Sequence, residues 1–371
     1  MQNMASLLAS SKKIQQSYKP LILRLNVPAD KATFETLFAE GKVLFVHDEM
    51  YGQLQELVKI KYPAIKIKTD EYPQLIIDHL AGKNIDEYGV WVYYEWSKRL
   101  VHLLDEEEFE EVRTNRNRNK ITREEQAALK SKKIGIVGLS VGQSIALTIA
   151  TERICGELRL ADFDTAELSN LNRIRTGSHN LGLTKTVIAA REIVEIDPFI
   201  KVILFSDGLH KGNMDEFFTG GGKLDLFIEV CDGIDIKLDS RFKAKELQIP
   251  VVMDTNDRGM LDIERFDLEN DRGIMHGMLD AFIDQNSIVV TDENRQGILM
   301  SILSFDSLSE RMKLSMGEIG KTINTWPQLA SSVVLGGAIT TDITRRILLG
   351  EHRQSGRYYV DLDSIFNEKS I

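Results

Sequence analysis

The chain has 371 residues, and its 46 lysines and arginines against 56 aspartates and glutamates give a formal net charge of −10. This length allows two domains with sizeable cores, and the acidic balance argues against a general nucleic-acid binder, so local basic groups would have to hold any polyphosphate. Two cysteines cannot build a disulfide framework or a four-thiolate zinc site, no apolar run is long enough to span a bilayer and no secretory signal opens the sequence, so we expect a cytoplasmic protein.

Residues 1–108 predict a small α/β domain whose role the sequence does not indicate. After a polar start with an apolar patch over residues 4–9, which predicts a flexible end or one loose helix, strands and helices alternate. The predicted strands cover residues 21–25, 43–46, 89–96 and 99–104. The predicted helices cover residues 31–40, with Asp30 as N-cap, 53–61 and 73–81.

A sharp change of composition follows this domain. The acidic run over residues 105–111 meets a basic, asparagine-rich segment over residues 113–120. We therefore predict the domain boundary between residues 108 and 109, with the charge run as a solvated helix end and linker.

Residues 134–161 have the pattern of the first half of a βαβ nucleotide-binding unit. A β-branched apolar run over 134–137 predicts a buried strand, a glycine turn follows, and residues 144–150 have helical spacing. The small residues Gly138, Ser140 and Gly142 would let backbone N–H groups approach a phosphate at the positive end of that helix. The next strand, 158–161, ends at Asp162, where an acid can bond ribose hydroxyls. A tight turn without a ligand is the structural alternative.

The segment after this acid is more specific. Residues 162–173, DFDTAELSNLNR, closely resemble the signature of the ThiF/MoeB family, the ATP-dependent activators of ubiquitin-like proteins and sulfur carriers. The resemblance extends through Lys185 and the sequence EVCD at 229–232, and covers about residues 110–371. It implies a doubly wound, Rossmann-like, mostly parallel α/β domain over 109–371. It also implies an adenylyltransferase that activates a carboxylate, the C-terminus of a ubiquitin-like or sulfur-carrier protein or peptide, as an acyl adenylate.

The same resemblance implies roles for individual residues. The glycine turn seats the nucleotide, Asp162 holds the ribose, and Ser140 and Asp164 belong to the nucleotide-binding set. The residues implied to handle phosphates and Mg²⁺ are Asn170, Arg173 and Lys185 for the β- and γ-phosphates and Asp232 for the metal. Arg118, or Arg116 close behind it, is implied to reach the triphosphate of a second protomer, so the active form would be a homodimer.

These implied roles compete with plainer ones. Surface charge is the commonest role of residues such as Arg173 and Lys185, and Asp232 could instead be the N-cap of a helix that starts near Ile234. His179 lies between the two cations, where we expect a mobile polar loop.

The chain also departs from the family's pattern. It lacks the paired CxxC motifs that many members use for structural zinc, so we predict no zinc. No cysteine occurs between Asp254 and the end, so we predict no thioester on the chain. Cys155 and Cys231 are interpreted as small buried residues.

The remaining elements continue the winding. Helices are predicted over residues 184–196, 213–218 and 236–248, and strands over 201–205, 224–230 and 249–254. Residues 259–266 predict an alternating strand at a substrate-facing edge, and 275–325 a methionine-rich, mostly helical region. Pro327 should open a helix that runs to Leu349 and ends at Gly350, with a final strand over 358–362. Residues 336–338, GGA, indicate close helix packing at a possible dimer interface.

Two other functions remain open at this point. A glycine turn followed by an acid fits an NAD-dependent oxidoreductase equally well, although Gln143 stands where that class prefers glycine and the later cations stay unexplained. A noncatalytic adaptor that keeps the fold to bind a partner is the second alternative.

Overall fold

The computed structural model describes residues 16–284 and 287–366, which fall into two compact units. The first unit extends to Glu124 and also includes Val194–Phe199, and the second comprises Glu125–Ile193 and the chain from Ile200 onward. The predicted flexible end or loose helix around residues 4–9 lies outside the described residues. The predicted boundary between residues 108 and 109 falls within helix α5 (Glu106–Arg113), inside the first unit.

The first unit is a four-stranded sheet with helices, as predicted. The strand order is β1-β3-β4-β2, with bounds Leu21–Leu23, Val90–Tyr94, Arg99–Leu103 and Phe45–Asp48. Strands β3 and β4 pair antiparallel, whereas β2 runs parallel to β4 at the edge. The helices are α2 (Pro28–Ala39), α3 (Met50–Lys61) and α4 (Tyr72–Leu80).

One predicted cap in this unit is wrong. Helix α2 begins at Pro28 after the N-cap Val27, three residues earlier than predicted, because proline is pre-set for the first helical turn. Asp30 therefore lies within that turn, where its carboxylate accepts the backbone N–H of Arg24 at 2.9 Å. The charge run also differs from a linker, since α5 is a regular helix capped by Asp105.

The second unit contains a seven-stranded, mostly parallel sheet, which confirms the predicted fold class. The strand order is β11-β10-β9-β8-β5-β6-β7. The bounds are β5 (Lys133–Val137), β6 (Glu157–Ala161), β7 (Lys201–Phe205), β8 (Leu226–Glu229), β9 (Val251–Asp254), β10 (Met260–Glu264) and β11 (Gly356–Tyr359). Strands β9, β8, β5, β6 and β7 are parallel, and β10 and β11 add antiparallel pairs. The chain winds outward from β5 through β6 to β7, then returns to β8 on the other side of β5, so the winding reverses between β5 and β8.

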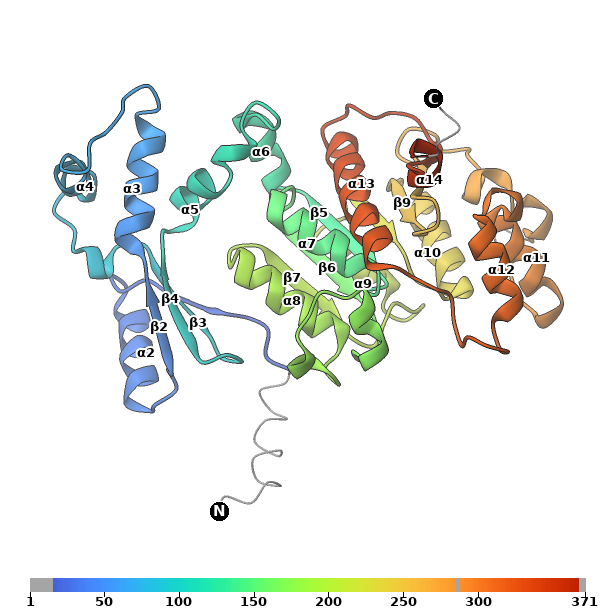
Figure 1. Ribbon diagram of the computed structural model, residues 1–371, viewed down its shortest axis with the longest axis horizontal. Helices are drawn as coiled ribbons and strands as arrows, with labels where there is room; N and C mark the ends of the chain where they lie inside the picture. Colours follow the sequence, from blue (N-terminus) through green and yellow to red (C-terminus); the bar gives the residue numbers. More distant parts are fainter. Residues whose placement is uncertain (1–15, 285–286, 367–371) are drawn as a thin grey trace, which may run out of the picture. The chain divides into compact units, whose positions relative to one another are not determined.

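Helices connect these strands (Figure 1). They are α6 (Arg123–Lys130), α7 (Gly142–Glu152), α8 (Lys185–Ile196), α9 (Met214–Thr219), α10 (Ile234–Glu246), α11 (Asp292–Leu303), α12 (Glu310–Glu318), α13 (Ala330–Leu348) and α14 (Leu362–Ile365). Helix α6 was not predicted. Within the described part of the chain, no helix combines the length and the apolar character needed to cross a bilayer.

Helix α13 packs closely on α7 and on the end of β9 (Figure 1). A Cβ atom added to Gly337 would lie 2.5 Å from Ser144 Oγ, and one added to Gly336 would lie 2.0 Å from Asp254 Oδ2. The predicted close packing is therefore present, and it occurs inside the unit. The packing of α13 within one chain is enough to explain why glycine occupies both positions.

Three predictions in the C-terminal third are wrong. Strand β10 is not at an edge, because β11 pairs with its outer side, and all five of its residues are buried. Pro327 does not open α13, which begins at Ala330 after Leu329, because residues 319–328 form a separate connection. The last strand ends at Tyr359 and begins two residues before the predicted one.

Candidate functional site

A cavity of about 960 Å³ lies where β5, β6 and β8 end. This is the carboxyl edge of the parallel strands at the reversal of winding, which is where doubly wound sheets bind ligands. The predicted site residues on its wall are Gly138, Ser140, Asp162, Asp164, Asn170, Arg173, Lys185 and Asp232. The structure thus brings together residues that span 95 positions of sequence.

The turn after β5 can only be made by glycine at its first position. Gly138 has a φ of 88°, and a Cβ atom there would lie 2.6 Å from the carbonyl oxygen of Val230. Gly142 does not line the cavity: a Cβ atom on it would lie 2.9 Å from Ile136 Cγ2, so this glycine lets α7 pack against β5. Its predicted contact with the nucleotide stays a prediction.

Asp162 connects this turn to the end of β6. One carboxylate oxygen accepts the N–H of Leu139 at 2.6 Å and the other accepts the N–H of Asp164 at 2.8 Å. Burial raises the pKa of Asp162, while these bonds and the charge of Lys185 act in the opposite direction. Each oxygen keeps a second lone pair, so the carboxylate can still accept a hydroxyl group of a ligand.

Lys185 is a buried cation at the start of α8. Its side chain is 7% exposed, and its ammonium lies 2.7 Å from Asp164 Oδ2, whose own side chain is 51% exposed. Its backbone N–H donates to the Asp164 carbonyl at 2.9 Å, so the helix start and the loop after β6 are fixed to each other. A buried ammonium facing a polar cavity suits an anionic ligand.

Arg173 contacts the glycine turn directly. Its Nε donates to Ser140 Oγ at 3.0 Å and its Nη1 donates to Asn172 Oδ1 at 2.8 Å. Burial lowers its pKa, and the negative charge of Asp232 opposes that shift. Asn170, which is 8% exposed, accepts the N–H of Glu167 and so caps the short 3₁₀ helix Leu168–Asn172, which Arg173 follows directly.

Asp232 is an exposed carboxylate beyond the end of β8. The N-cap of α10 is Gly233, and no side chain caps this helix, so the alternative role for Asp232 as N-cap is wrong. Together with phosphate oxygens and water, one such carboxylate is a typical ligand set for Mg²⁺. Residues 16–284 and 287–366 contain no group of three acidic, histidine or cysteine side chains that could hold a metal without phosphate.

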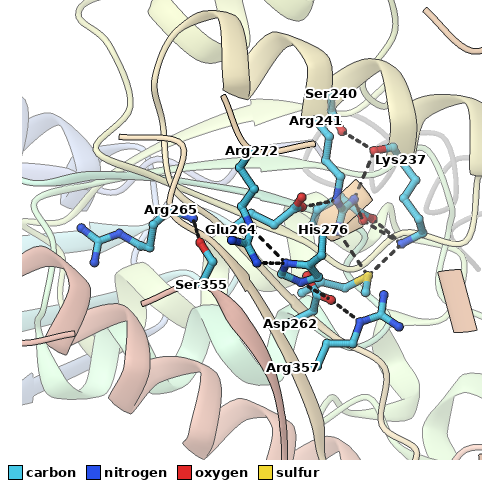
Figure 2. Close-up of polar contacts among 12 residues, drawn as sticks. Lys237, Ser240, Arg241, Asp262, Glu264, Arg265, Arg272, His276, Ser355 and Arg357 are labelled. Atoms are coloured by element: carbon cyan, nitrogen blue, oxygen red, sulfur yellow. Dashed lines mark hydrogen bonds and ion pairs between the residues drawn. The ribbon is translucent and has the colours of Figure 1, made fainter. Parts of the chain in front are cut away.

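A buried ionic network fixes the turn that carries Asp232. Glu229 accepts the N–H of Cys231 at 2.9 Å and is itself held by Lys237 and by Arg241. Burial opposes the charge on Glu229, yet these two cations bring its pKa down to about 2. Figure 2 shows Lys237 and Arg241 from α10 facing the strand that carries Glu264.

The network continues across β10. Asp262 pairs with His276 at 2.9 Å and with Arg357 from β11 (Figure 2). The alternation of β10 thus points its two acids into the buried network, not toward a substrate.

Arg118 lies in the first unit, where its guanidinium pairs with Glu111. Glu111 also pairs with Arg123 at 2.7 Å. The action of Arg118, or of Arg116, on a second protomer's nucleotide stays a prediction.

Sequence reasoning missed part of the cavity wall. Residues 322–328 line it, and the carbonyl of Gln328 accepts Asn172 Nδ2 at 2.9 Å. Phe163, which is 73% exposed, contributes an aromatic face. Pro327 is predicted as a helix start, whereas prolines are also common in connections such as this one. Phe163 carries no signal beyond its place in the family's motif.

The two cysteines differ in burial. Cys155 is 1% exposed, as predicted, whereas Cys231 is only half-buried and lines the cavity. Burial and the negative charge of Glu229 raise the pKa of Cys231 well above its usual range. Its thiol is therefore held in the unreactive, protonated form at neutral pH.

The sequence profile of the ThiF family matches residues 114–301. The chain belongs to the ThiF family. The matched range contains the glycine turn, both cations and Asp232, so the residues that form the cavity lie within the family's shared region apart from the 322–328 segment. Membership gives the chain an adenylyltransferase-like ThiF fold.

Several proteins resemble this ThiF member in sequence. A Mycobacterium tuberculosis protein, MT1398, is 44% identical over 280 residues, which is 76% of this chain and 39% of that protein. Ubiquitin-like modifier-activating enzyme 5 of Arabidopsis thaliana is 28% identical over 31% of this chain and 30% of its own length. The chain thus spans well under half the length of these two relatives. The tRNA threonylcarbamoyladenosine dehydratase of Bacillus subtilis is 21% identical over 63% of this chain and 95% of its own length.

Solved structures also align with it. The Escherichia coli tRNA N6-threonylcarbamoyladenosine dehydratase in complex with ATP aligns at 16% identity with a TM-score of 0.46, covering 65% of this chain and 95% of that one. Escherichia coli MccB with AMPCPP and the MccA peptide aligns at 12% identity and 0.44, covering 84% and 87%.

Proposed function

We propose that this ThiF-family protein is an ATP-dependent adenylyltransferase that activates a carboxylate, the C-terminus of a small protein or peptide, as an acyl adenylate. The observation that carries the proposal is the convergence of Arg173, Lys185 and Asp232 on one cavity at the reversal of winding. In this reaction the substrate carboxylate attacks the α-phosphorus of ATP, and pyrophosphate leaves. Such a step requires alignment and neutralisation of charge, and no protein nucleophile.

Each side chain has a task in this proposal. Asp162 accepts a ribose hydroxyl, and the N–H groups of the glycine turn face the phosphates. Arg173 and Lys185 neutralise charge on the pyrophosphate as it leaves, with Asn170 donating beside them. Mg²⁺, when bound at Asp232 and the phosphates, would neutralise further charge.

The wall of the cavity favours ATP over NAD. A dinucleotide needs one pyrophosphate contact at the glycine turn and has no use for two further cations beyond the ribose-binding acid. The buried ammonium of Lys185 and the half-buried guanidinium of Arg173 supply that extra positive charge here. The rival oxidoreductase function leaves both unexplained.

The acyl group should leave the protein as the adenylate or pass to an acceptor that is not a cysteine of this chain. Cys231 is the cysteine on the cavity wall, and its raised pKa argues against a thiolate that could attack the adenylate. ATP–pyrophosphate exchange, measured as incorporation of labelled pyrophosphate into ATP, should therefore proceed in the Cys231→Ala protein as in the wild type.

The test compares nucleotide binding by calorimetry in the full chain. ATP with Mg²⁺ should bind to the wild type, and Arg173→Met and Lys185→Met should each weaken this binding about 10-fold or more, since a hydrogen bond to a charged group contributes about 1.5–3 kcal/mol. Adenosine, which has no phosphate, should bind all three proteins alike.

The control is Lys211→Met, which removes a lysine whose side chain is 83% exposed and absent from the cavity wall. Its ATP affinity should equal that of the wild type. Tighter binding of NAD than of ATP, or equal losses for adenosine and ATP in the cation variants, would reject the proposal.

A further inference from the structure

A second, smaller cavity of about 140 Å³ adjoins the first. The two share Val230, Cys231 and Asp232 on one side and residues 326–328 on the other. The smaller cavity therefore begins where the proposed adenylation site ends. Its far wall comes from β9, β10, α11 and α12, which do not contribute to the larger cavity.

Most of this far wall is apolar. The side chains are Met253, Met260, Leu299, Ile302, Leu303, Leu308 and Met312. An apolar cavity of roughly 150 Å³ is large enough for a benzene ring, so this one has room for a leucine or phenylalanine side chain. Flexible methionines in the wall let it adapt to the shape of its occupant.

Three residues of this wall also carry buried oxygens that have no donor among the described residues. Asp254, at the end of β9, is 4% exposed; its Oδ1 accepts the N–H of Asn256 at 3.1 Å, and its Oδ2 has no hydrogen-bond partner among the described residues. Asn256 Oδ1 and Gln328 Oε1 are buried on this wall and likewise without a partner in the described chain. Asp254 Oδ2 and Asn256 Oδ1 lie against Gly336 of α13, where an added Cβ atom would be 2.0 Å and 3.2 Å from them, and α13 does not line the cavity. The space that a ligand could enter is therefore bounded mainly by the apolar side chains.

Burial raises the pKa of Asp254 to about 7. The carboxyl group would thus be ionised only partly at neutral pH. Among the described residues no cation forms an ion pair with Asp254, whereas Glu229 is held by two.

The loop that carries these oxygens is held firmly. Asp257 accepts the backbone N–H of Ser309 at 2.9 Å and its hydroxyl at 2.7 Å. Arg258 pairs with Asp361 at 2.8 Å and donates to the carbonyl of Ser307 at 2.8 Å. The loop after β9 is therefore tied to the start of α12, and both sides of the cavity are positioned by the same contacts.

We infer that the smaller cavity holds the last residue of the acyl substrate, and that this residue has an apolar side chain. This inference rests on the proposed function. The apolar wall takes the side chain, and the carboxylate of that residue faces the shared wall at Asp232. A glycine would leave the apolar part empty and give up the corresponding affinity.

The first experiment measures ATP–pyrophosphate exchange by the full chain with acetyl-Ala-Ala-Gly, acetyl-Ala-Ala-Leu and acetyl-Ala-Ala-Phe. The Leu or Phe peptide should give kcat/KM at least about 10-fold above the Gly peptide, the scale set by apolar pockets. A Gly peptide that equals or exceeds both would overturn the inference while the proposed function stands.

One variant, with a matched control, tests the cavity itself. Ile302→Phe enlarges a side chain that is 2% exposed on the cavity wall, and it should lower exchange with the Leu peptide about 10-fold while the Gly peptide changes little. Leu314→Phe, at a position 72% exposed and off the wall, is the matched control and should change nothing.

Binding separates the two failures. Peptide affinities are measured by calorimetry with saturating AMPCPP, so that no turnover is needed. Suppose that ATP binds but no peptide supports exchange. The Leu peptide must then still bind more tightly than the Gly peptide, and Ile302→Phe must abolish this preference. The inference is rejected if either result fails to appear. If ATP itself does not bind to the wild type, it is the proposed function that fails.

Discussion

At the scale of single residues, Asp232 differs from Asp162 because it is exposed and does not cap a helix. Replacing it should therefore cost the fold little. Asp162, by contrast, holds two backbone N–H groups, so its loss would disturb the glycine turn itself.

Asp232→Ala should reduce ATP–pyrophosphate exchange at least about 100-fold. The Mg²⁺ that this residue helps to hold would stabilise the charge of the transition state by several kcal/mol. The melting temperature should stay within about 2 °C of the wild type, as expected for an exposed side chain. Asp235→Ala, which removes a carboxylate 60% exposed in the first turn of α10, should keep full exchange. Equal exchange in wild type and Asp232→Ala would remove this residue from the mechanism.

Asp254 gives the protein a stability that depends on pH. Its folded pKa of about 7 lies above its ordinary value of 3.8, because burial disfavours the charge. Between these two values the folded state retains a proton that the unfolded chain has released. Unfolding then releases the proton, so raising the pH through this range lowers the free energy of unfolding.

Asp254→Asn removes this effect, so the variant should gain stability over the wild type as pH rises. The difference should be near zero below pH 4 and largest at pH 8, with an upper bound of roughly 4 kcal/mol at 1.36 kcal/mol per pH unit. Urea denaturation at pH 4, 6 and 8 measures it. A difference independent of pH would show that Asp254 is ionised in the folded protein throughout.

At the scale of elements, the contact of α13 with α7 depends on the absence of a side chain at Gly337. Gly337→Ala would place a Cβ atom 2.5 Å from Ser144 Oγ and 3.1 Å from the Ser144 backbone, so rotating the serine cannot relieve the overlap fully. Overpacking of this kind costs about 1–3 kcal/mol. The cost should appear as a lower free energy of unfolding in urea.

Gly317→Ala in α12 is the matched comparison, since a Cβ atom there meets nothing within 4 Å. It should be neutral or stabilise by about 0.4–1 kcal/mol, because alanine restricts the unfolded chain. Equal effects of the two substitutions would mean that α13 does not pack as described.

The sequence predicts those elements whose pattern of apolar residues can be recognised within the segment itself. The buried strands and the helix after Gly138 have apolar patterns that need no partner to be recognised, and they are present. Strand β10 alternates in the same way, but its polar positions, Asp262 and Glu264, are satisfied by cations from α10 and β11 that lie far away in sequence. Pairing of this kind is set by tertiary structure, so the sequence alone placed this strand wrongly at an edge.

The site shows the same division. The family's motif placed Arg173, Lys185 and Asp232 on a common ligand, and they do line one cavity. The sequence did not predict Asp254 and Gln328 as part of the site. Their distinguishing feature is a buried side-chain oxygen without a hydrogen-bond donor. Burial and missing partners are properties of the folded chain.

At the scale of the whole molecule, the predicted role of Arg118 concerns two copies of the chain. In one copy this arginine pairs with Glu111, which also holds Arg123, so reaching a partner's phosphates would require it to exchange one anion for another. The triphosphate carries more charge than a carboxylate, which makes such an exchange favourable. A homodimer with each Arg118 in the other's site is thus the arrangement that we propose.

This arrangement predicts that two inactive variants restore each other. Arg118→Ala and Asp232→Ala should each lack exchange alone. In a mixed dimer with twofold symmetry, one site carries both defects and the other carries neither. Random mixing makes half of the dimers mixed, so activity should recover to about a quarter of the wild-type value.

The two variants would be unfolded together, refolded and assayed, with mixtures of Asp232→Ala and wild type as the reference for simple dilution. Arg123→Ala removes the other cation that pairs with Glu111. It should not behave like Arg118→Ala, because only the side chain of Arg118 is proposed to enter the partner's site. If the mixture of Arg118→Ala and Asp232→Ala stays inactive while each refolds to the same oligomer as the wild type, Arg118 does not act across subunits. Full activity of Arg118→Ala alone would leave Arg116→Ala as the variant to put through the same mixing experiment.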